Sequence, residues 1–402
     1  MVANLLREDW ANLNSAELRL LLDARIGHPG QYDGKSTNKI FLPLAGSSCR
    51  VGLTFRGKDI VAIEPGPGFD ADEWKRISEE IDTSIKAGPI KTGREYSFSS
   101  FRVSGSWRGR NSHVQILPPP DDAPDAEEEM AEHPFILEFP IMESNLWPIT
   151  NHRRIREHRK ITLLLNVLLA GHTTFQAQRA EHFWASIRYT DRHEIKWVQR
   201  FYFAKLGSAV IDDLSPIATE LLEEMEPEEY YSRVGHDGRG LRVPADLDDS
   251  ISLYQNLPST QRDQFDRAAF WLEMARRQWN VAVSSSFASL VTAVESLTNR
   301  GAIHQVYCEH CKADRQHEVP GATSRFRDFF EEYTPGAVLK RWRDEMYSLR
   351  SGILHGSELM QLDQDLAFGW DPPWWKEREL HDELWTITRL AVRNWLKGSA
   401  KK

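Results

Sequence analysis

Apolar residues recur at every third or fourth position through the last third of the chain, which is the spacing of amphipathic helices. The pattern predicts helices at about 262–299, 323–334, 337–355 and 377–397. In the third of these, the expected buried seam consists of Leu339, Trp342, Met346, Leu349 and Ile353. We therefore expect an all-α domain over residues 261–402.

The first half of the chain mixes helical spacing with short segments rich in β-branched and aromatic residues, which favour strands. Predicted helices cover 13–26, 71–88 and 149–171. Predicted strands lie within 39–63, 95–104, 112–117, 133–142, 181–190 and 194–206. Residues 1–210 should form a mixed sheet-and-helix domain that senses a signal or binds RNA. Residues 211–260, a short acidic helix followed by loop-like sequence, should be a linker, so the expected fold class is α+β.

Composition narrows the class of protein. The chain has 402 residues, of which 41% are hydrophobic and 27% charged, as in an ordinary globular protein. No apolar run approaches the roughly 18 to 20 residues of a membrane span, and charges interrupt the first residues where a signal peptide has an apolar core. Three cysteines cannot form a disulfide framework. We expect a cytoplasmic protein with no membrane partner.

Charge is distributed unevenly along the chain. The net charge is −9, which argues against a general binder of polyanions. From residue 260 onward, however, 20 Lys and Arg balance 20 Asp and Glu, so the whole acidic excess lies in the first 259 residues. The C-terminal third could therefore approach RNA without a large repulsive field.

The end of the helix predicted at 337–355 carries an Arg, four residues and a His, namely Arg350 and His355. Both lie beside the apolar seam. Arginine can hold a phosphate through two parallel hydrogen bonds, and histidine is the side chain whose proton affinity lies nearest neutral pH. Together they indicate RNA as a partner.

Two segments, SLVTAVESLTNR (289–300) and MYSLRSGILHGSEL (346–359), together resemble the HEPN superfamily, specifically its Apea-like branch, whose signature is an Arg, four to six residues and a His. The resemblance covers about residues 261–397. It implies a small helical domain that forms a homodimer with facing Arg/His pairs and commonly acts as a metal-independent endoribonuclease. Many family members are non-catalytic modules for dimerisation or RNA binding. Family context implies bacterial phage defence or a toxin-like role, with a regulatory partner.

The chemistry expected of Arg350 and His355 is cleavage of RNA by its own 2′-hydroxyl. A neutral histidine takes the hydroxyl proton, the alkoxide attacks phosphorus, and arginine neutralises the charge that builds on the phosphate. No metal cofactor is needed, and DNA is spared. Residues five apart on an unbroken helix lie about 140° apart. We therefore expect either that Gly352 or Gly356 breaks the helix, or that a dimer pairs Arg from one subunit with His from the other.

Each of these residues also has a plainer explanation. Glu295, on the facing helix, could orient Arg350 or His355, or simply form a salt bridge at the edge of the core. Ser351 could help to hold a phosphate, or be a small residue that permits close packing. His355 could merely end the helix while Arg350 pairs with a nearby carboxylate, for which the candidates are Asp344 and Glu345.

The segment HQVYCEHCKADRQH (304–317) has two cysteines at the two-residue spacing that lets both thiolates reach one Zn²⁺. The candidate ligands are Cys308, Cys311, His304 and His317. A closed site with four ligands would staple the loop between two core helices rather than catalyse, because it has no open position for water. The alternative is two reduced cysteines in a polar loop.

A basic segment, HRRIREHRK (152–160), places several cations within three helical turns, enough to neutralise several phosphates. The candidate RNA contacts are Arg153, Arg156 and Arg159. Such a run is also typical of a solvated helix face, which here could pair with the acidic segment 121–129.

Overall fold

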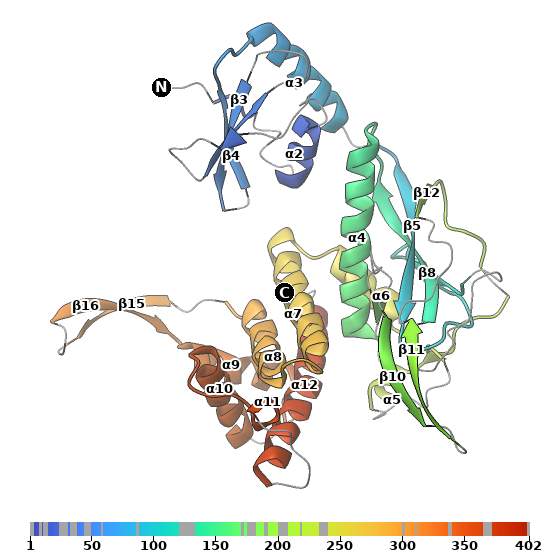
Figure 1. Cartoon of the computed structure of the whole chain (residues 1–402), viewed down its shortest axis with the longest axis vertical. Helices are drawn as coiled ribbons and strands as arrows, with labels where there is room; N and C mark the ends of the chain where they lie inside the picture. The colour runs from blue at the N-terminus through green and yellow to red at the C-terminus, as the bar shows by residue number, and fades with distance from the viewer. Residues whose placement is uncertain are drawn as a thin grey trace. The chain divides into compact units, whose positions relative to one another are not determined.

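The computed structural model describes residues 4–7, 10, 15–23, 31–32, 38–43, 50–57, 59–85, 88–119, 133–169, 173–174, 182–188, 192–199, 208–217, 219–232, 240–299, 302–308, 310, 312–336, 340–364 and 372–399. Strands and helices mix in its first half and helices dominate its last third, which confirms the predicted α+β class (Figure 1). Contacts divide the chain into two units. Unit 1 contains Met1–Gly93, Phe139–Glu157 and Val210–Asp213; unit 2 contains Arg94–Glu138, His158–Ala209 and Leu214–Lys402.

Unit 1 is built around a four-stranded antiparallel sheet. Its strands follow sequence order and are β1 (Gln31–Tyr32), β2 (Lys39–Pro43), β3 (Arg50–Arg56) and β4 (Asp59–Pro65). Two helices, α2 (Ser15–Asp23) and α3 (Ala71–Ile85), share one apolar core with the sheet, in which Leu22, Val51 and Ile63 are fully buried. The Asp70 carboxylate accepts hydrogen bonds from the backbone N–H groups of Asp72 and Glu73, which caps the start of α3.

Unit 2 contains most of a six-stranded sheet, with strand order β12-β5-β8-β7-β6 and β9 paired to β5. These strands are β5 (Ile90–Ser99), β6 (Trp107–Arg108), β7 (Gln115–Leu117), β8 (His133–Met142), β9 (Thr173–Thr174) and β12 (Ala209–Ile211). The division between the units falls within β5, β8, β12 and the long helix α4 (Trp147–Leu168). Each unit is therefore assembled from stretches that are separated in sequence.

The remaining short elements of unit 2 include two predicted strands and part of the predicted linker. The strand predictions near 181–206 are confirmed as β10 (His182–Arg188) and β11 (His193–Gln199), which form an antiparallel hairpin. Within 211–260 the structure has more order than the loop-like sequence indicates, because it contains β13 (Glu224–Met225), α5 (Pro227–Ser232), β14 (Val243–Pro244) and α6 (Leu247–Gln255). The Asp248 side chain of α6 accepts hydrogen bonds from the backbone of Arg110, Asn111 and Ser112, which ties the start of this helix to the β6–β7 connection.

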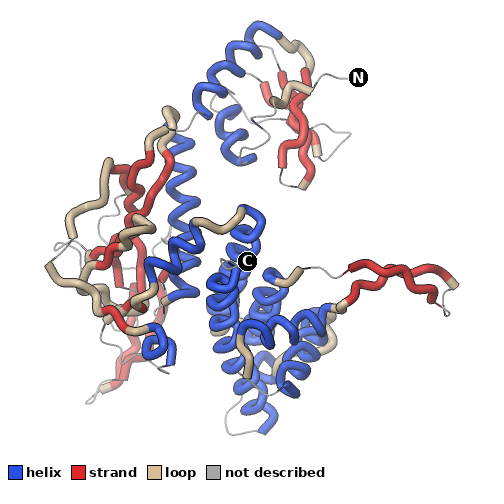
Figure 2. Tube along the Cα trace, turned by 180° about the vertical axis from the view of Figure 1, so that it is seen from behind, coloured by secondary structure: helices blue, strands red, loops and turns tan. Residues whose placement is uncertain are grey.

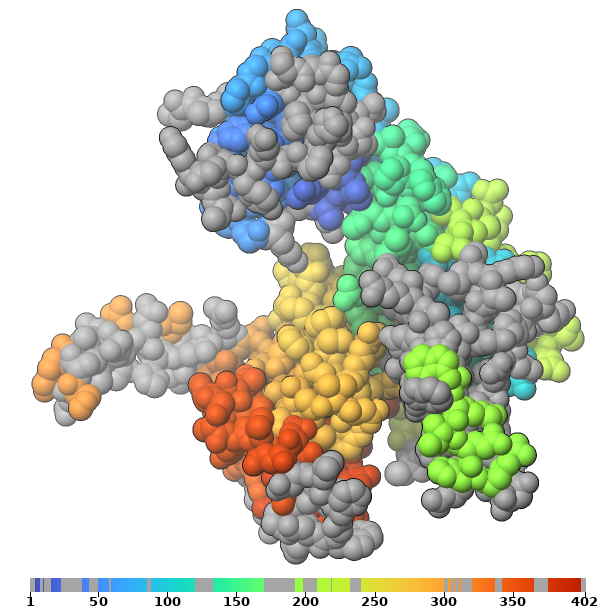
Figure 3. All heavy atoms as spheres, viewed as in Figure 1, coloured from blue at the N-terminus to red at the C-terminus, as the bar shows by residue number. Residues whose placement is uncertain are grey.

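The last third of the chain forms a helical bundle, in which the helices pack directly on one another (Figures 2 and 3). Its helices are α7 (Ser259–Gln278), α8 (Val283–Leu297), α9 (Ala322–Tyr333), α10 (Lys340–Leu354), α11 (Gln361–Gln364) and α12 (Pro372–Ser399). The single helix expected at 262–299 is wrong, because the chain turns between α7 and α8. The Asp363 carboxylate caps the new helix by accepting hydrogen bonds from the N–H groups of Val283 and Ser284, at 2.8 and 2.7 Å.

Helix α12 ties this bundle to the end of α4 within unit 2. Arg389 Nη2 donates hydrogen bonds to the backbone oxygens of Asn166 and Leu169, which belong to the last turn of α4 and the residue after it. Arg393 lies with its guanidinium carbon 3.4 Å from the ring centre of Tyr231, and the Tyr231 hydroxyl donates to the Leu168 oxygen at 2.8 Å. Positive charge at this position complements the dipole of α4.

Candidate active site

Helix α10 ends in a glycine cap that places His355 at the surface. Gly356 has φ = 72°, the left-handed conformation that glycine adopts without strain. The Gly356 N–H donates to the Ile353 oxygen at 3.1 Å, and the Ser357 N–H donates to the Gly352 oxygen at 3.0 Å. This pair of bonds is the Schellman motif, with His355 as the C-cap residue. The His355 side chain is exposed.

Arg350 is held by a carboxylate from a neighbouring helix. Its Nη2 donates to Glu295 Oε2 of α8 at 2.6 Å, and its guanidinium lies 5.6 Å from the ring centre of Tyr347. The side chains of Arg350 and Glu295 are 19% and 27% exposed, so the pair still reaches solvent. Arg350 Nε is buried without a hydrogen-bond partner among the residues that the structure describes. The guanidinium is therefore fixed in place but not saturated.

Neither carboxylate expected near Arg350 is its partner. Asp344 pairs with Arg327 at 3.2 Å, and Glu345 pairs with Lys376. The position of Glu295 fits the expectation that it orients Arg350, and equally the expectation of a salt bridge at the edge of the core. Ser351 is half-buried, and its backbone oxygen accepts the His355 N–H at 3.0 Å.

Helix α10 remains regular through Gly352, so that glycine does not break it. A Cβ at position 352 would lie 2.3 Å from Glu358 Oε2, so the exposed Glu358 side chain would have to move aside. Only Gly356 acts as expected, by ending the helix. In a regular helix, Arg350 and His355 leave the axis in directions about 140° apart.

Tyr347 belongs to this site and was not among the residues singled out in the sequence. Its hydroxyl donates to Glu295 Oε1 at 3.4 Å. Burial, together with the negative charge of Glu295, raises the pKa of Tyr347, so the hydroxyl keeps its proton. The signal was present in the sequence, because residues three apart on a helix are neighbours and Tyr347 precedes Arg350 by three.

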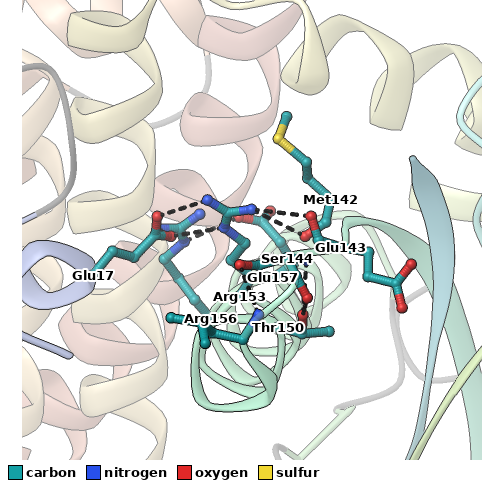
Figure 4. Close-up of polar contacts among 9 residues, drawn as sticks. Glu17, Met142, Glu143, Ser144, Thr150, Arg153, Arg156 and Glu157 are labelled. Atoms are coloured by element: carbon teal, nitrogen blue, oxygen red, sulfur yellow. Dashed lines mark hydrogen bonds and ion pairs between the residues drawn. The ribbon is translucent and has the colours of Figure 1, made fainter. Parts of the chain in front are cut away.

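The arginines of α4 that were candidate RNA contacts are largely occupied within the fold of unit 1. Arg153 is buried, and it donates to Glu17 through Nη2 at 3.1 Å and to the backbone oxygens of Met142 and Glu143 (Figure 4). Arg156 Nη1 donates to the same carboxylate at 2.8 Å. Arg159, which belongs to unit 2, is the one of the three candidates that is exposed. Its guanidinium lies 5.7 Å from the ring centre of Phe270.

The segment with the candidate zinc ligands forms a hairpin where a loop was expected. The strands are β15 (Ala302–Cys308) and β16 (Ala313–Val319), and the register places His304 opposite His317. Cys311 lies outside the described residues, as do the side chains of His304, Cys308 and His317. Among the side chains that are described, no group of three or more His, Cys, Asp or Glu could hold a metal ion.

Comparisons with protein-family models, curated proteins and solved structures found no match to this chain. The resemblance to the HEPN superfamily thus depends on the residues of segments 289–300 and 346–359 alone. Among the helices within the described ranges, none has the combined length and apolar character needed to cross a bilayer.

Proposed function

We propose that this protein is a metal-independent endoribonuclease of HEPN type, in which Arg350 and His355 act on the RNA phosphate. The end of α10 carries the proposal: an exposed histidine caps the helix about one and a half turns beyond an arginine that a neighbouring carboxylate holds at a solvent-reaching face. A role in phage defence or as a toxin, under control of a regulatory partner, belongs to the same proposal.

In this mechanism, His355 is the base that takes the 2′-hydroxyl proton. The resulting alkoxide attacks phosphorus and displaces the 5′-oxygen of the next nucleotide, which takes up the proton that His355 had accepted; the products are a 2′,3′-cyclic phosphate and a 5′-hydroxyl. Arg350 stabilises the charge that develops on the phosphate oxygens. Glu295 orients the guanidinium, whose five N–H donors can serve more than one acceptor.

The regular geometry of α10 makes a homodimer part of the proposal. Residues five apart on a regular helix leave its axis about 140° apart, and α10 is regular up to Leu354, so we do not expect one chain to aim both Arg350 and His355 at one phosphate. A two-fold axis near the end of α10 would bring the arginine of one subunit to the histidine of the other.

Cleavage of end-labelled RNA in EDTA tests the proposed activity. We expect the protein to cut RNA but not DNA of the same sequence, and the Arg350→Ala and His355→Ala variants to be slower by at least about 100-fold. Arg76→Ala and His310→Ala, at exposed positions elsewhere, are matched controls that should retain the full rate. Cleavage that survives in both active-site variants, or that requires an added divalent metal, contradicts the proposal.

Mixing the two inactive variants tests the shared site. A heterodimer of Arg350→Ala and His355→Ala subunits has one site in which both wild-type residues are present, if each site takes one residue from each subunit. We expect part of the activity to return on mixing, up to about half in each heterodimer. If the mixture stays inactive at every ratio although the subunits exchange, Arg350 and His355 act together within one chain.

One observation favours a second candidate function, that of a non-catalytic module that holds RNA or dimerises. The charge of Arg350 is already balanced by Glu295, as in a structural ion pair. This function would be supported if the wild type binds RNA, the Arg350→Ala variant does not, and the RNA stays intact at high protein concentration. Glu295→Gln separates the two further, since it should slow a cleaving enzyme but tighten RNA binding to a module by removing a competing carboxylate.

A further inference from the structure

A pocket of about 740 Å³ opens in the helical bundle, apart from the residues assigned above. It is lined by the first turns of α7, the end of α8, one face of α9 and Trp395 of α12. Its apolar lining includes Leu297 and Pro320 as well as three aromatic residues, Phe329, Tyr333 and Trp395, and the ring centres of Phe329 and Tyr333 lie 4.9 Å apart. Phe329 and Trp395 are otherwise buried. Tyr333 is half-buried and therefore offers the most ring surface of the three for contact with a planar ligand.

The polar lining is rich in hydrogen-bond acceptors. Asp263, Asp328 and Glu332 contribute carboxylates, and the amide oxygen of Gln261 is buried without a partner among the described residues. A buried acceptor that lacks a donor costs free energy, so a ligand that supplies N–H groups would gain by binding here. The side-chain amides of Gln264 and Asn299 also line the pocket, and Gln264 Nε2 donates to Asn299 Oδ1 at 3.4 Å, so one donor and one acceptor remain between them for a ligand.

The charge of the lining indicates which part of a nucleotide would enter. Three carboxylates face two guanidinium groups, those of Arg267 and Arg325, so the pocket is negative by one charge. A phosphate is therefore a poor occupant and a neutral base a good one. Among the RNA bases, guanine alone carries adjacent N–H and NH₂ donors on one edge, which match the two oxygens of a carboxylate.

The pocket is joined to the candidate active site through α8 and α9. Thr298 and Asn299 line the pocket and follow Glu295 by about one turn. On α9, Arg325 lines the pocket and adjoins Phe326, whose ring packs 5.3 Å from that of Tyr347. Tyr347 in turn bonds to Glu295, the partner of Arg350. An RNA strand could thus place a base in the pocket and a phosphate near Arg350.

We propose that this pocket binds an unpaired guanine of the RNA substrate, with Asp328 and Gln261 as acceptors, and so gives the enzyme a preference for cutting next to guanosine. The RNA part of this inference rests on the proposed function, whereas binding of guanine does not. The Tyr333 ring contacts the base, and the phosphate that follows stays outside the negatively charged lining.

Binding of guanosine to the full chain, measured by calorimetry, tests the pocket without any cleavage. We expect guanosine to bind at least 10-fold more tightly than adenosine or uridine. Asp328→Asn and Gln261→Leu should each weaken guanosine binding about 10-fold, while Asp249→Asn, an exposed carboxylate outside the pocket, should not. Gln261→Leu removes an unpaired acceptor, so it should keep or raise the thermal midpoint. Equal binding of the three nucleosides, or no effect of either variant, overturns the assignment.

Cleavage then separates this inference from the proposed function. On an RNA with single G and single A sites, we expect the wild type to prefer the G site and both pocket variants to lose that preference. Guanosine binding without any RNA cleavage supports the pocket assignment and contradicts the proposed nuclease function. Cleavage without guanosine binding or base preference supports the nuclease function and contradicts the pocket assignment. Tighter binding of GTP than of a short G-containing RNA assigns the site to a free nucleotide and overturns the RNA assignment.

Discussion

His381 of α12 is a buried histidine whose neutral state the bundle requires. Its Nε2 lies 2.8 Å from Ser286 Oγ, and that hydroxyl donates its own hydrogen to the Ala275 oxygen at 2.7 Å. The ring nitrogen must therefore be the donor to Ser286. Trp279 packs on the ring, with the two ring centres 4.3 Å apart. Burial lowers the pKa of His381 to about 4.

This burial predicts a loss of stability in mild acid. Between about pH 6.5 and pH 4 the unfolded chain takes up a proton on His381 that the folded chain does not, so stability is full above pH 6.5 and falls as the pH drops. The loss at pH 4 should approach about 3 kcal/mol. Urea unfolding at pH 7.5 and 4.5 measures it. His381→Gln should reduce the difference between the unfolding free energies measured at the two pH values. His310→Gln, an exposed control, should leave that difference unchanged.

The ion-pair cluster around Glu17 leads to a second prediction about a single residue, the effect of Glu17→Gln on stability. Glu17 accepts hydrogen bonds from two arginines, and Arg153 is buried beside it (Figure 4). Glu17→Gln removes the balancing charge and should cost about 3 kcal/mol in urea unfolding, because a buried cation is left unpaired. Glu79→Gln, on the exposed face of α3, should cost less than about 0.5 kcal/mol. Equal unfolding midpoints for the two variants contradict a stabilising role for the cluster.

At the scale of elements, the cap of α10 predicts a link between backbone geometry and activity. Gly356→Ala places a side chain in the left-handed conformation and should cost about 1 kcal/mol. Because the cap fixes His355, the variant should also be slower in the proposed RNA cleavage. Gly336→Ala is the matched control, since Gly336 has φ = 75° after α9 and also faces open space. It should lose similar stability and keep the cleavage rate.

Helical spacing predicted most helices because it depends on local sequence alone. It found α3, α4, α9, α10 and α12 at nearly their observed positions. It failed between α7 and α8, where the cap is Asp363, some 80 positions away. It also failed at 302–319, where a polar segment with two cysteines forms a hairpin instead of a loop. Elements whose ends depend on distant side chains are thus the ones that sequence misplaces.

The candidate site shows the same division between local and distant information. The positions of Arg350 and His355 at the end of a helix followed from spacing and from Gly356. The inward direction of Arg153 did not, because its partner Glu17 lies 136 positions away and a basic run looks the same whether solvated or paired. The pocket of about 740 Å³ in the bundle could not be predicted from sequence either, since its lining comes from four helices.

For the whole molecule, the domain order expected from sequence was three consecutive blocks, with a helical domain at 261–402. The contacts instead interleave the units, and they place β6, β7 and the end of α4 in the same unit as the bundle. Composition and turn signals cannot reveal this arrangement, because they report on neighbouring residues in the sequence and not on contacts between distant segments. The stability of the bundle must then depend on residues that precede it.

A fragment of residues 261–402 tests that dependence. It keeps Arg389 but lacks the Asn166 and Leu169 oxygens that this side chain contacts, and Lys397 loses its ion pair with Asp246. Arg389 is half-buried in the full chain; in the fragment its guanidinium faces water, so each of these lost hydrogen bonds should cost about 1 kcal/mol. We expect the fragment to unfold at least about 10 °C below the helices of the full chain, as followed by circular dichroism at 222 nm. Arg389→Leu should destabilise the full chain by removing these two hydrogen bonds and should leave the fragment nearly unchanged, because the fragment has already lost them. A fragment as stable as the full chain would instead establish the helices as an independent domain.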